Sequence, residues 1–600
     1  MYKIIHNQDR RDRVPIDRNN LVICLRVHSD SAHEANVQLC HWNRQLDDPQ
    51  SYNVIKMKLI TRSSEYDYYE GIISTTYPSS YIKYIFKIED SMSEVFWDYY
   101  GERLTFSSKH AFEYLYTNAL DVIRPVKWLE NAVFYQIFPE RFYNGNTVLN
   151  PEVTCEWDAE PTRENFMGGD LSGITKKLDY LVGLGVNALY LNPIFQAISN
   201  HKYDTTNYYK IDQNFGTNLD FKEFVEECHK RDIRVILDGV FNHCGDTFPF
   251  FEEALNDINS KYRKWFYFDD IVLNENEKLE YECVGYYDRM PKFDYSNREV
   301  RDYFIDVGEF WMKEYNIDGW RLDVADEISY SFWYEFRNAI KTINPDALLL
   351  GETWGEKPDM LLGDQMDSVM NYLFMDAVKE YIAEESISTS QFDERLNRIT
   401  MVYSRNVRGQ LFNLIGSHDT ERFYTSVNED NEKYKIAMTL LLMYRGVPSI
   451  YYGDEIPLTG KNDPGCRGTI DWSNNANAMR EYIQKLISIR HSKEAIRVGD
   501  FTSNVCDNKK SCYGFIRSTD LETMCILVNL SNQEQIIDLP INVTGVKIKE
   551  LLSGKEGVMV DLGAIDVEEF HNSDINSYIM KSQICIGANS SAIYEVCKHE

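Results

Sequence analysis

The sequence contains no run of 18 or more apolar residues, so it predicts no transmembrane helix. Its first nine residues also lack the long apolar stretch of a secretory signal peptide. The 12 cysteines are scattered singly and form no Cys-x-x-Cys pair, which favours buried, reduced thiols. We therefore expect a cytoplasmic protein without a membrane partner.

Positive charge is also scarce, because 63 Lys and Arg stand against 94 Asp and Glu, for a net charge of −31. A nucleic-acid partner is not expected, since such binding depends largely on Lys and Arg that neutralise phosphates. A neutral substrate is compatible with this charge. Apolar residues make up 43% of the chain and aromatic residues 14%, as in a folded globular protein.

The length of 600 residues predicts several domains. Residues 1–124 read as β structure, with alternating or apolar runs at 21–27, 37–42 and 83–88. Residues 501–600 return to β patterns after a long mixed region. We expect β-sandwich domains at both ends of the chain.

Residues 125–500 alternate between strand-like runs and helices with apolar residues at helical spacing. One helix is expected from Asp170 to the glycines Gly183 and Gly185. Alternation over such a length predicts a parallel α/β fold, and the count of eight strands is that of a (β/α)₈ barrel. The expected strands lie at 133–138, 186–191, 233–237, 319–323, 348–350, 368–370, 411–415 and 449–452. The irregular stretch at about 240–297 is expected to be an insertion, domain B.

Polar clusters follow several of these strands. In chain order, these polar segments are Asn192 and Pro193, Asp238 to His243, Arg321 to Asp323, Glu352 to Trp354, and Ser417 to Thr420. In a barrel all these strand ends lie on one rim, where the active sites of this fold are found. A single carboxylate at a strand end is usually structural, but so many polar strand ends favour a catalytic site.

Arg321 and Asp323 are two residues apart, so in a strand their side chains point to the same side. The guanidinium is expected to lower the pKa of Asp323 and keep it ionised. An ionised carboxylate is the nucleophile that attack on a sugar carbon needs. Taken alone, the pair is equally compatible with a structural ion pair at a strand end.

These segments resemble the signature regions of the α-amylase family of glycoside hydrolases, family 13, over roughly residues 125–500. Met290-Pro291-Lys292-Phe293 and Trp354 resemble the subfamily of neopullulanases, cyclomaltodextrinases and maltogenic amylases, as do 134–142 and 201–205. The sequence departs from that subfamily at Gly355 and Phe293, where histidine and leucine are commoner. The N-terminal domain resembles the subfamily's extra domain, which implies a homodimer formed through it.

The resemblance implies Asp323 as nucleophile, Glu352 as general acid/base and Asp419 as transition-state stabiliser. A retaining mechanism then places the carboxyls of Asp323 and Glu352 about 5–5.5 Å apart. Further residues are implied in substrate binding or in support of the site: Tyr203, Asp238, His243, Arg321, Trp354, His418, Asp463 and Arg467.

A loop before the first barrel helix resembles the place where relatives bind calcium. Its residues are Asn144, Asn146, Asn150, Gly168 and Asp170, and oxygen ligands of this kind suit Ca²⁺. The alternative is a loop held together by hydrogen bonds between asparagine side chains and the backbone. The chemistry itself requires no cofactor.

We expect a retaining α-glucan hydrolase that cleaves α-1,4 bonds, and some α-1,6 bonds, in maltooligosaccharides, cyclodextrins or pullulan, with transglycosylation as a further outcome. One alternative is a catalytically inert relative that binds glucans, although the intact acids argue against it. Within enzymes, an oligo-1,6-glucosidase or an α-glucanotransferase stays open, and the block at Met290 to Phe293 disfavours the glucosidase.

Overall fold

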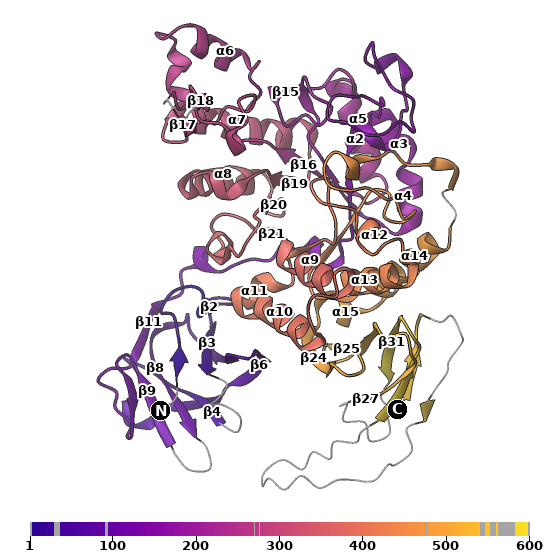
Figure 1. The fold of residues 1–600 in the computed structure, drawn as a ribbon. Coiled ribbons are helices and arrows are strands. Elements are labelled where there is room, and N and C mark those ends of the chain that lie inside the picture. Colours follow the sequence, from indigo (N-terminus) through magenta and orange to yellow (C-terminus); the bar gives the residue numbers. More distant parts are fainter. Residues whose placement is uncertain are drawn as a thin grey trace.

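The computed structural model describes residues 3–28, 36–89, 94–268, 271–274, 277–474, 477–539, 547–552, 560–561 and 582–597. A barrel with surrounding helices forms the larger part of the molecule, and a β domain from each end of the chain lies below it in Figure 1. None of the described helices combines the length and apolarity needed to span a membrane.

Eight parallel strands close into a barrel, which confirms the predicted fold class. All eight are buried along their whole length or nearly so, because helices cover the outside of the barrel and side chains fill its interior. In order around the barrel the strands are β12 (Phe134–Ile137), β13 (Ala188–Leu191), β16 (Arg234–Gly239), β19 (Gly319–Leu322), β20 (Leu348–Gly351), β21 (Ser368–Asn371), β22 (Phe412–Asn413) and β23 (Val447–Tyr451).

The helices between the strands bury the predicted faces. In α5 (Asn218–His229) the buried residues are Phe221, Phe224, Val225 and Cys228, and a capping box between Thr217 and Asp220 begins the helix. The helices α7 (Arg298–Tyr315) and α8 (Tyr330–Ile343) pack against each other and likewise bury their apolar positions.

The first barrel helix differs from its prediction. It is divided at Lys177 into α3 (Leu171–Lys176) and α4 (Leu178–Leu184). Gly183 lies inside α4, whereas Gly185 ends it with φ of 99°, a conformation that favours glycine. The expectation that both glycines end the helix was therefore wrong for Gly183.

The N-terminal domain is a sandwich of two antiparallel sheets around an apolar core of its own. One sheet contains β1 (Ile4–Ile5), β2 (Arg13–Pro15), β3 (Asn20–His28), β6 (Lys58–Arg62) and β7 (Tyr66–Ser74). The other contains β4 (Asn36–Asn43), β5 (Asn53–Lys56), β8 (Ser80–Glu89), β9 (Glu94–Asp98), β10 (Gly101–Arg103) and β11 (Phe112–Tyr116).

The segment inserted after β16 returns to the rim of the barrel. It includes α6 (Pro249–Asn256), β17 (Ile271–Asn274) and β18 (Glu277–Leu279). Its end pairs with the residues after β16 through a bridge between His243 and Lys292, and a second bridge joins Phe266 to Phe293 within the segment. The segment at Met290 to Phe293 is thereby held beside His243.

The C-terminal domain is antiparallel and packs under the barrel helices. Its larger sheet contains β24 (Asp500–Asp507), β25 (Cys512–Ser518), β26 (Thr523–Asn529), β31 (Ser590–Cys597), β28 (Lys547–Glu550) and β29 (Val560–Asp561). A second, two-stranded sheet pairs β27 (Gln535–Leu539) with β30 (Ser582–Ile586). The strand β31 contacts α13 (Asn431–Met443), and β24 contacts both α10 (Thr389–Val402) and β6 of the N-terminal domain.

Candidate active site

Arg321 on β19 is the centre of the polar cluster at the barrel rim. Its side chain is fully buried. Nη1 donates to Oδ1 of Asp238 at 2.8 Å and to Oδ1 of Asp323 at 2.8 Å. Nη2 lies 2.8 Å from Oε1 of Glu352. One guanidinium therefore holds three carboxyls from three neighbouring strand ends.

The backbone after β19 aims the two predicted catalytic carboxyls at each other. The strand ends at Leu322, one residue earlier than expected, yet Asp323 still forms the predicted pair with Arg321. Val324 then adopts φ of 43°, which is uncommon for a β-branched residue and typical of strained functional sites. In this turn the amide of Val324 donates to Oε2 of Glu352 at 3.0 Å.

Burial dominates the ionisation of these acids. It raises the pKa of Asp323 well above its usual value, Arg321 opposes this rise, and the neighbouring Glu352 and Asp238 add to it. The pKa of Glu352 is also raised by burial, as is that of Asp419. The expectation that Arg321 lowers the pKa of Asp323 holds for the contribution of Arg321 itself. The net pKa is nevertheless raised, because burial, with Glu352 and Asp238 adding to it, outweighs the guanidinium.

The balance of charges suits acid/base chemistry. Five carboxyl groups share the guanidiniums of Arg321 and Arg467 in this part of the rim: Asp238, Asp323, Glu352, Asp419 and Asp463. Carboxyl groups so close to one another cannot all be ionised easily, so the cluster favours a proton on one of them. A glycosidase needs one protonated carboxyl and one ionised carboxyl at the same pH.

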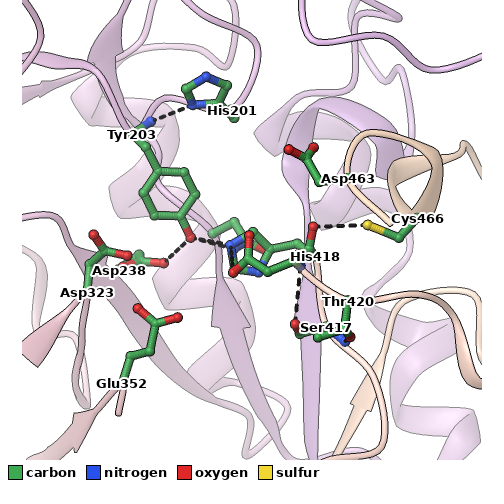
Figure 2. Close-up of polar contacts among 12 residues, drawn as sticks. His201, Tyr203, Asp238, Asp323, Glu352, Ser417, His418, Thr420, Asp463 and Cys466 are labelled. Carbon is green, nitrogen blue, oxygen red and sulfur yellow. Dashed lines mark hydrogen bonds and ion pairs between the residues drawn. The ribbon is translucent and has the colours of Figure 1, made fainter. Parts of the chain in front are cut away.

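Tyr203 lies against His418 at one side of the site, and Figure 2 shows the Tyr203 hydroxyl pointing toward His418 and Asp238. Their rings are nearly parallel, with centroids 5.4 Å apart. The hydroxyl of Tyr203 donates to Oδ2 of Asp238 at 3.0 Å and lies 2.5 Å from Nε2 of His418. Nε2 of Gln136 donates to Nδ1 of His418 at 2.9 Å, so the proton of the neutral imidazole sits on Nε2. Burial lowers the pKa of His418 and keeps this ring neutral.

His243 differs from His418 in its partners. It is buried after β16, and neither ring nitrogen has a hydrogen-bond partner among the described residues. Burial lowers the pKa of His243 to about 3, so the ring is neutral and offers one donor and one acceptor. Since His243 lines the pocket, these two nitrogens are placed to bind sugar hydroxyls.

The outer part of the site contains the remaining predicted residues. Nη1 of Arg467 lies 2.8 Å from Oδ1 of Asp463, and Nη2 donates to Oδ1 of Asp419 at 3.2 Å. Trp354 is 55% exposed and stacks on Tyr372 with ring centroids 4.1 Å apart. Its exposed face can therefore meet a sugar ring that enters the pocket.

A pocket of about 710 Å³ unites these groups. Of the eleven residues predicted for catalysis and substrate binding, eight line it: Tyr203, His243, Asp323, Glu352, Trp354, Asp419, Asp463 and Arg467. Asp238, Arg321 and His418 lie beneath this lining and hold it. The structure thus brings the predicted set together.

Sequence reasoning missed several supporting residues. Gln136 on β12 orients His418, and Tyr190 on β13 donates to Oδ2 of Asp238 at 2.6 Å. Both are polar groups inside otherwise apolar buried strands, which is the signal that could have identified them. Phe166 and Arg289 also line the pocket, but they lie in loops whose path the sequence pattern does not reveal.

The predicted calcium loop forms its own hydrogen-bond network. Asp170 accepts from the backbone amides of Gly145, Asn146 and Gly173. Nδ2 of Asn144 donates to Oδ1 of Asn150 at 3.0 Å. A bond between an asparagine side chain and the backbone, as in the alternative, is also present, because Oδ1 of Asn146 accepts from the amide of Val148 at 3.2 Å.

Two observations still fit a cation in that loop. Oδ1 of Asn144 is buried and has no partner among the described residues. Gly168 has φ of 84°, and a side chain there would collide with the amide groups of Asn144 and Asn150. The donor set is oxygen-rich with a single carboxylate, which calcium accepts better than a transition metal does.

The model of the alpha amylase catalytic domain matches residues 136–504, and the model of the alpha amylase N-terminal Ig-like domain matches residues 1–118. The chain belongs to the α-amylase family. It is accordingly a glycoside hydrolase of the α-amylase type, as its signature segments implied.

Three curated relatives narrow the likeness within the α-amylase family. A cyclomaltodextrinase of Geobacillus thermopakistaniensis is 40% identical over 76% of this chain and 78% of its own length. Neopullulanase 2 of Thermoactinomyces vulgaris is 39% identical over 82% and 85%. An intracellular maltogenic amylase of Bacillus subtilis is 35% identical over 82% and 86%. A solved cyclomaltodextrinase structure matches 98% of this chain and 99% of its own with a TM-score of 0.90 and 32% identity.

Proposed function

We propose that this α-amylase-family enzyme hydrolyses α-1,4-glucosidic bonds with retention of configuration. The observation that carries the proposal is the single guanidinium of Arg321 held between Asp323 and Glu352 at the floor of a pocket. It keeps a nucleophile and an acid/base close together, as a covalent mechanism requires.

In the first step Glu352 gives its proton to the glycosidic oxygen while an oxygen of Asp323 attacks the anomeric carbon. The bond from that carbon to the leaving oxygen breaks, and a glycosyl ester on Asp323 forms. In the second step Glu352 takes a proton from water, whose oxygen attacks the same carbon and releases Asp323. Asp419, beside His418 and Arg467, stabilises the positive charge that develops on the sugar.

The proposed substrates are maltooligosaccharides, cyclodextrins or pullulan. The segment at Met290 to Phe293 supports this class, because it is held beside His243 at the pocket. The names of the relatives, cyclomaltodextrinase and neopullulanase, point the same way. A sugar acceptor in place of water would give transglycosylation, and some α-1,6 cleavage belongs to the proposal.

A product profile on cyclodextrin, pullulan and starch, measured by chromatography, tests the substrate class. Faster hydrolysis of cyclodextrin than of starch supports it. Transfer products without net hydrolysis would favour an α-glucanotransferase, and cleavage confined to α-1,6 bonds would favour an oligo-1,6-glucosidase. Absence of turnover on every α-glucan, with binding retained, would favour the inert glucan-binding alternative.

We further propose a homodimer formed through the N-terminal domain. That domain exposes Tyr99, Tyr100, Leu104 and Leu115, apolar side chains that a second copy could cover. Sedimentation of the full chain tests this: dimers in the parent protein and monomers in Leu104→Asp support it. Exposed Leu521 in the C-terminal domain offers the matched control Leu521→Asp. A parent protein that sediments as a monomer contradicts the proposal.

A cytoplasmic location belongs to the same proposal. Eleven of the 12 cysteines have described side chains, and all eleven are free thiols, which suits a reducing compartment. The Bacillus subtilis relative is named intracellular. Fractionation of producing cells, with the activity followed in each fraction, tests the location.

We propose calcium as a structural ligand of the loop around Asn144, Asn150 and Asp170. The orphaned Oδ1 of Asn144 supports it. A bound ion would raise the Tm, and its removal by EDTA would lower it. The gain should be lost in Asn144→Leu, which keeps the side-chain size. An equal Tm with calcium and with EDTA contradicts the site.

A further inference from the structure

A second cavity, of about 200 Å³, lies where the three domains meet. It is lined by β6 of the N-terminal domain, by α11 (Arg405–Arg408) and α15 (Glu494–Val498) of the barrel layer, and by β24 and β25 of the C-terminal domain. Figure 1 shows β6 and β24 close together below α10. This junction cavity shares no lining residue with the active-site pocket at the barrel rim.

The junction cavity is strongly cationic although the chain has a net charge of −31. Two acidic residues, Glu70 and Asp500, line it together with six basic ones. The basic residues are Lys58, Arg405, Arg408, Arg445, Arg497 and Arg517.

The two acids are already engaged. Nη1 of Arg408 donates to Oε1 of Glu70 at 2.7 Å, and Arg405 lies 3.5 Å from the other oxygen of the same carboxylate. Nζ of Lys58 donates to Oδ2 of Asp500 at 3.0 Å, which joins the N-terminal and C-terminal domains. No carboxylate of the cavity lining is left for the other three arginines.

Arg445, Arg497 and Arg517 form no ion pair with any residue that the structure describes. Arg445 donates to the hydroxyl of Thr400, at 2.8 Å. Arg517 is fully buried and donates only to the carbonyls of Gly499 and Met443.

Guanidinium groups that have no carboxylate partner and line the same small cavity are energetically costly without an anion. Burial lowers the pKa of Arg445 to about 10, and repulsion from Arg408 contributes to this. The pKa of Arg517 is also lowered, by burial first and then by Arg490 and Arg445. A bound anion would oppose both pKa shifts, because it stabilises the charged guanidiniums.

We propose that the junction cavity binds a phosphate-class anion, either inorganic phosphate or the phosphate group of a small sugar phosphate. A tetrahedral anion offers oxygens in several directions, so it can meet three planar guanidiniums at once, whereas a carboxylate offers two oxygens in one plane. The bound anion ties the C-terminal domain to the barrel and to the N-terminal domain.

Thermal unfolding and calorimetric titration of the full chain test the proposal, with inorganic phosphate and glucose 6-phosphate as probes. The Tm should rise with phosphate concentration beyond the effect of sodium chloride at equal ionic strength. Glucose 6-phosphate that binds more than about tenfold tighter than phosphate identifies a sugar phosphate as the preferred ligand; equal affinities identify free phosphate.

Two variants place the binding in the cavity. Arg445→Gln should weaken phosphate binding about tenfold or more, because it removes a charged donor. Arg497→Gln serves as the second variant where Arg445→Gln does not fold, since Arg497 is another of the three arginines without an ion pair among the described residues and is only partly buried. Arg398→Gln is the matched control, because Arg398 is exposed and pairs with Glu356 outside the cavity.

The proposal is overturned if phosphate raises the Tm no more than sodium chloride does. It is also overturned if neither Arg445→Gln nor Arg497→Gln weakens binding, or if Arg398→Gln weakens it as much as they do. Turnover of an α-glucan is a separate readout, so loss of anion binding with activity intact leaves the proposed hydrolase function untouched.

Discussion

The active-site pocket and the junction cavity contain opposite excesses of charge. Six acidic residues and three arginines line the pocket, whereas two acidic residues and six basic ones line the cavity. In the pocket, burial and the carboxyls that share Arg321 raise the pKa of Asp323. In the cavity, burial and the nearby Arg408 lower the pKa of Arg445.

Each excess suits a different ligand. A neutral glucan develops positive charge at its anomeric carbon during cleavage, and an acid-rich site with low local polarity stabilises that charge. A cation-rich cavity stabilises a ligand that is already negative in the ground state. The first arrangement therefore favours catalysis, and the second favours binding.

The largest expected contrast between the two sites is in turnover. Glu352→Gln should lower kcat about 10²–10⁴-fold, because the amide cannot give or take the proton. Arg445→Gln should leave kcat within about twofold, since it lies at another site. Steady-state rates on maltotriose or cyclodextrin measure both. A Glu352→Gln enzyme that keeps full activity would contradict the proposed mechanism. It would also contradict the contrast between a catalytic pocket and a binding cavity.

Replacement of the shared cation tests how strictly the pocket depends on geometry. Arg321→Lys keeps the charge but removes the fork that reaches Asp323 with Nη1 and Glu352 with Nη2. We expect kcat to fall about 10²-fold, since a displaced carboxyl reacts poorly. The KM should change far less. Equal losses in Arg408→Lys, whose arginine pairs with Glu70 at the junction, would indicate a general effect on folding.

A change of Trp354 in the outer part of the pocket should have a moderate effect on substrate binding. Trp354→Ala should raise KM about 2–10-fold, because a stacking ring of this kind contributes about 0.5–1.5 kcal/mol. Trp354→Phe retains an aromatic face and should behave much more like the parent. Initial rates over a series of maltooligosaccharide lengths show the effect. An unchanged KM for every length would remove Trp354 from the binding site.

The smallest expected effect is on thermal stability. Removal of one charge should raise the Tm both at the pocket and at the cavity. The pKa of Asp323 is higher in the folded state than in the unfolded chain, so its ionised form destabilises the fold once the pH exceeds the unfolded value. Asp323→Asn should raise the Tm by roughly 2–4 °C at neutral pH, and the gain should shrink as the pH falls below the usual range of aspartate. Arg445→Gln should give a smaller gain in phosphate-free buffer, because Arg445 is only partly buried. Thermal scans at several pH values measure both, and a lower Tm for Asp323→Asn at neutral pH would contradict the charge argument.

Much of the barrel was predictable because its signals are local. Apolar runs marked the strands, and helical spacing marked α5, α7 and α8. The split at Lys177 was missed, since an apolar face with residues at 171, 174, 178 and 181 runs through both helices. The conformation of Val324 was also missed, because contacts with its neighbours impose a positive φ that valine alone would not adopt.

The acids of the site were predictable from their positions at strand ends, but their ionisation was not. Arg321 and Asp323 are neighbours in sequence, and their pairing followed from a strand's alternation. The raised pKa of Asp323 depends on burial and on Glu352 and Asp238, which come from other strands. The roles of Gln136 and Tyr190 likewise depend on which side chains the closed barrel brings together.

The sequence by itself therefore determined the order of strands and helices, the family, and the carboxylates that the chemistry needs, because these depend on short-range patterns and on residue types. Only the tertiary structure decided that three carboxyls share Arg321 and that arginines from the barrel layer and the C-terminal domain line one cavity beside the N-terminal domain. The physical reason is that charge interactions act across space, so their strength depends on distance and burial rather than on separation along the chain.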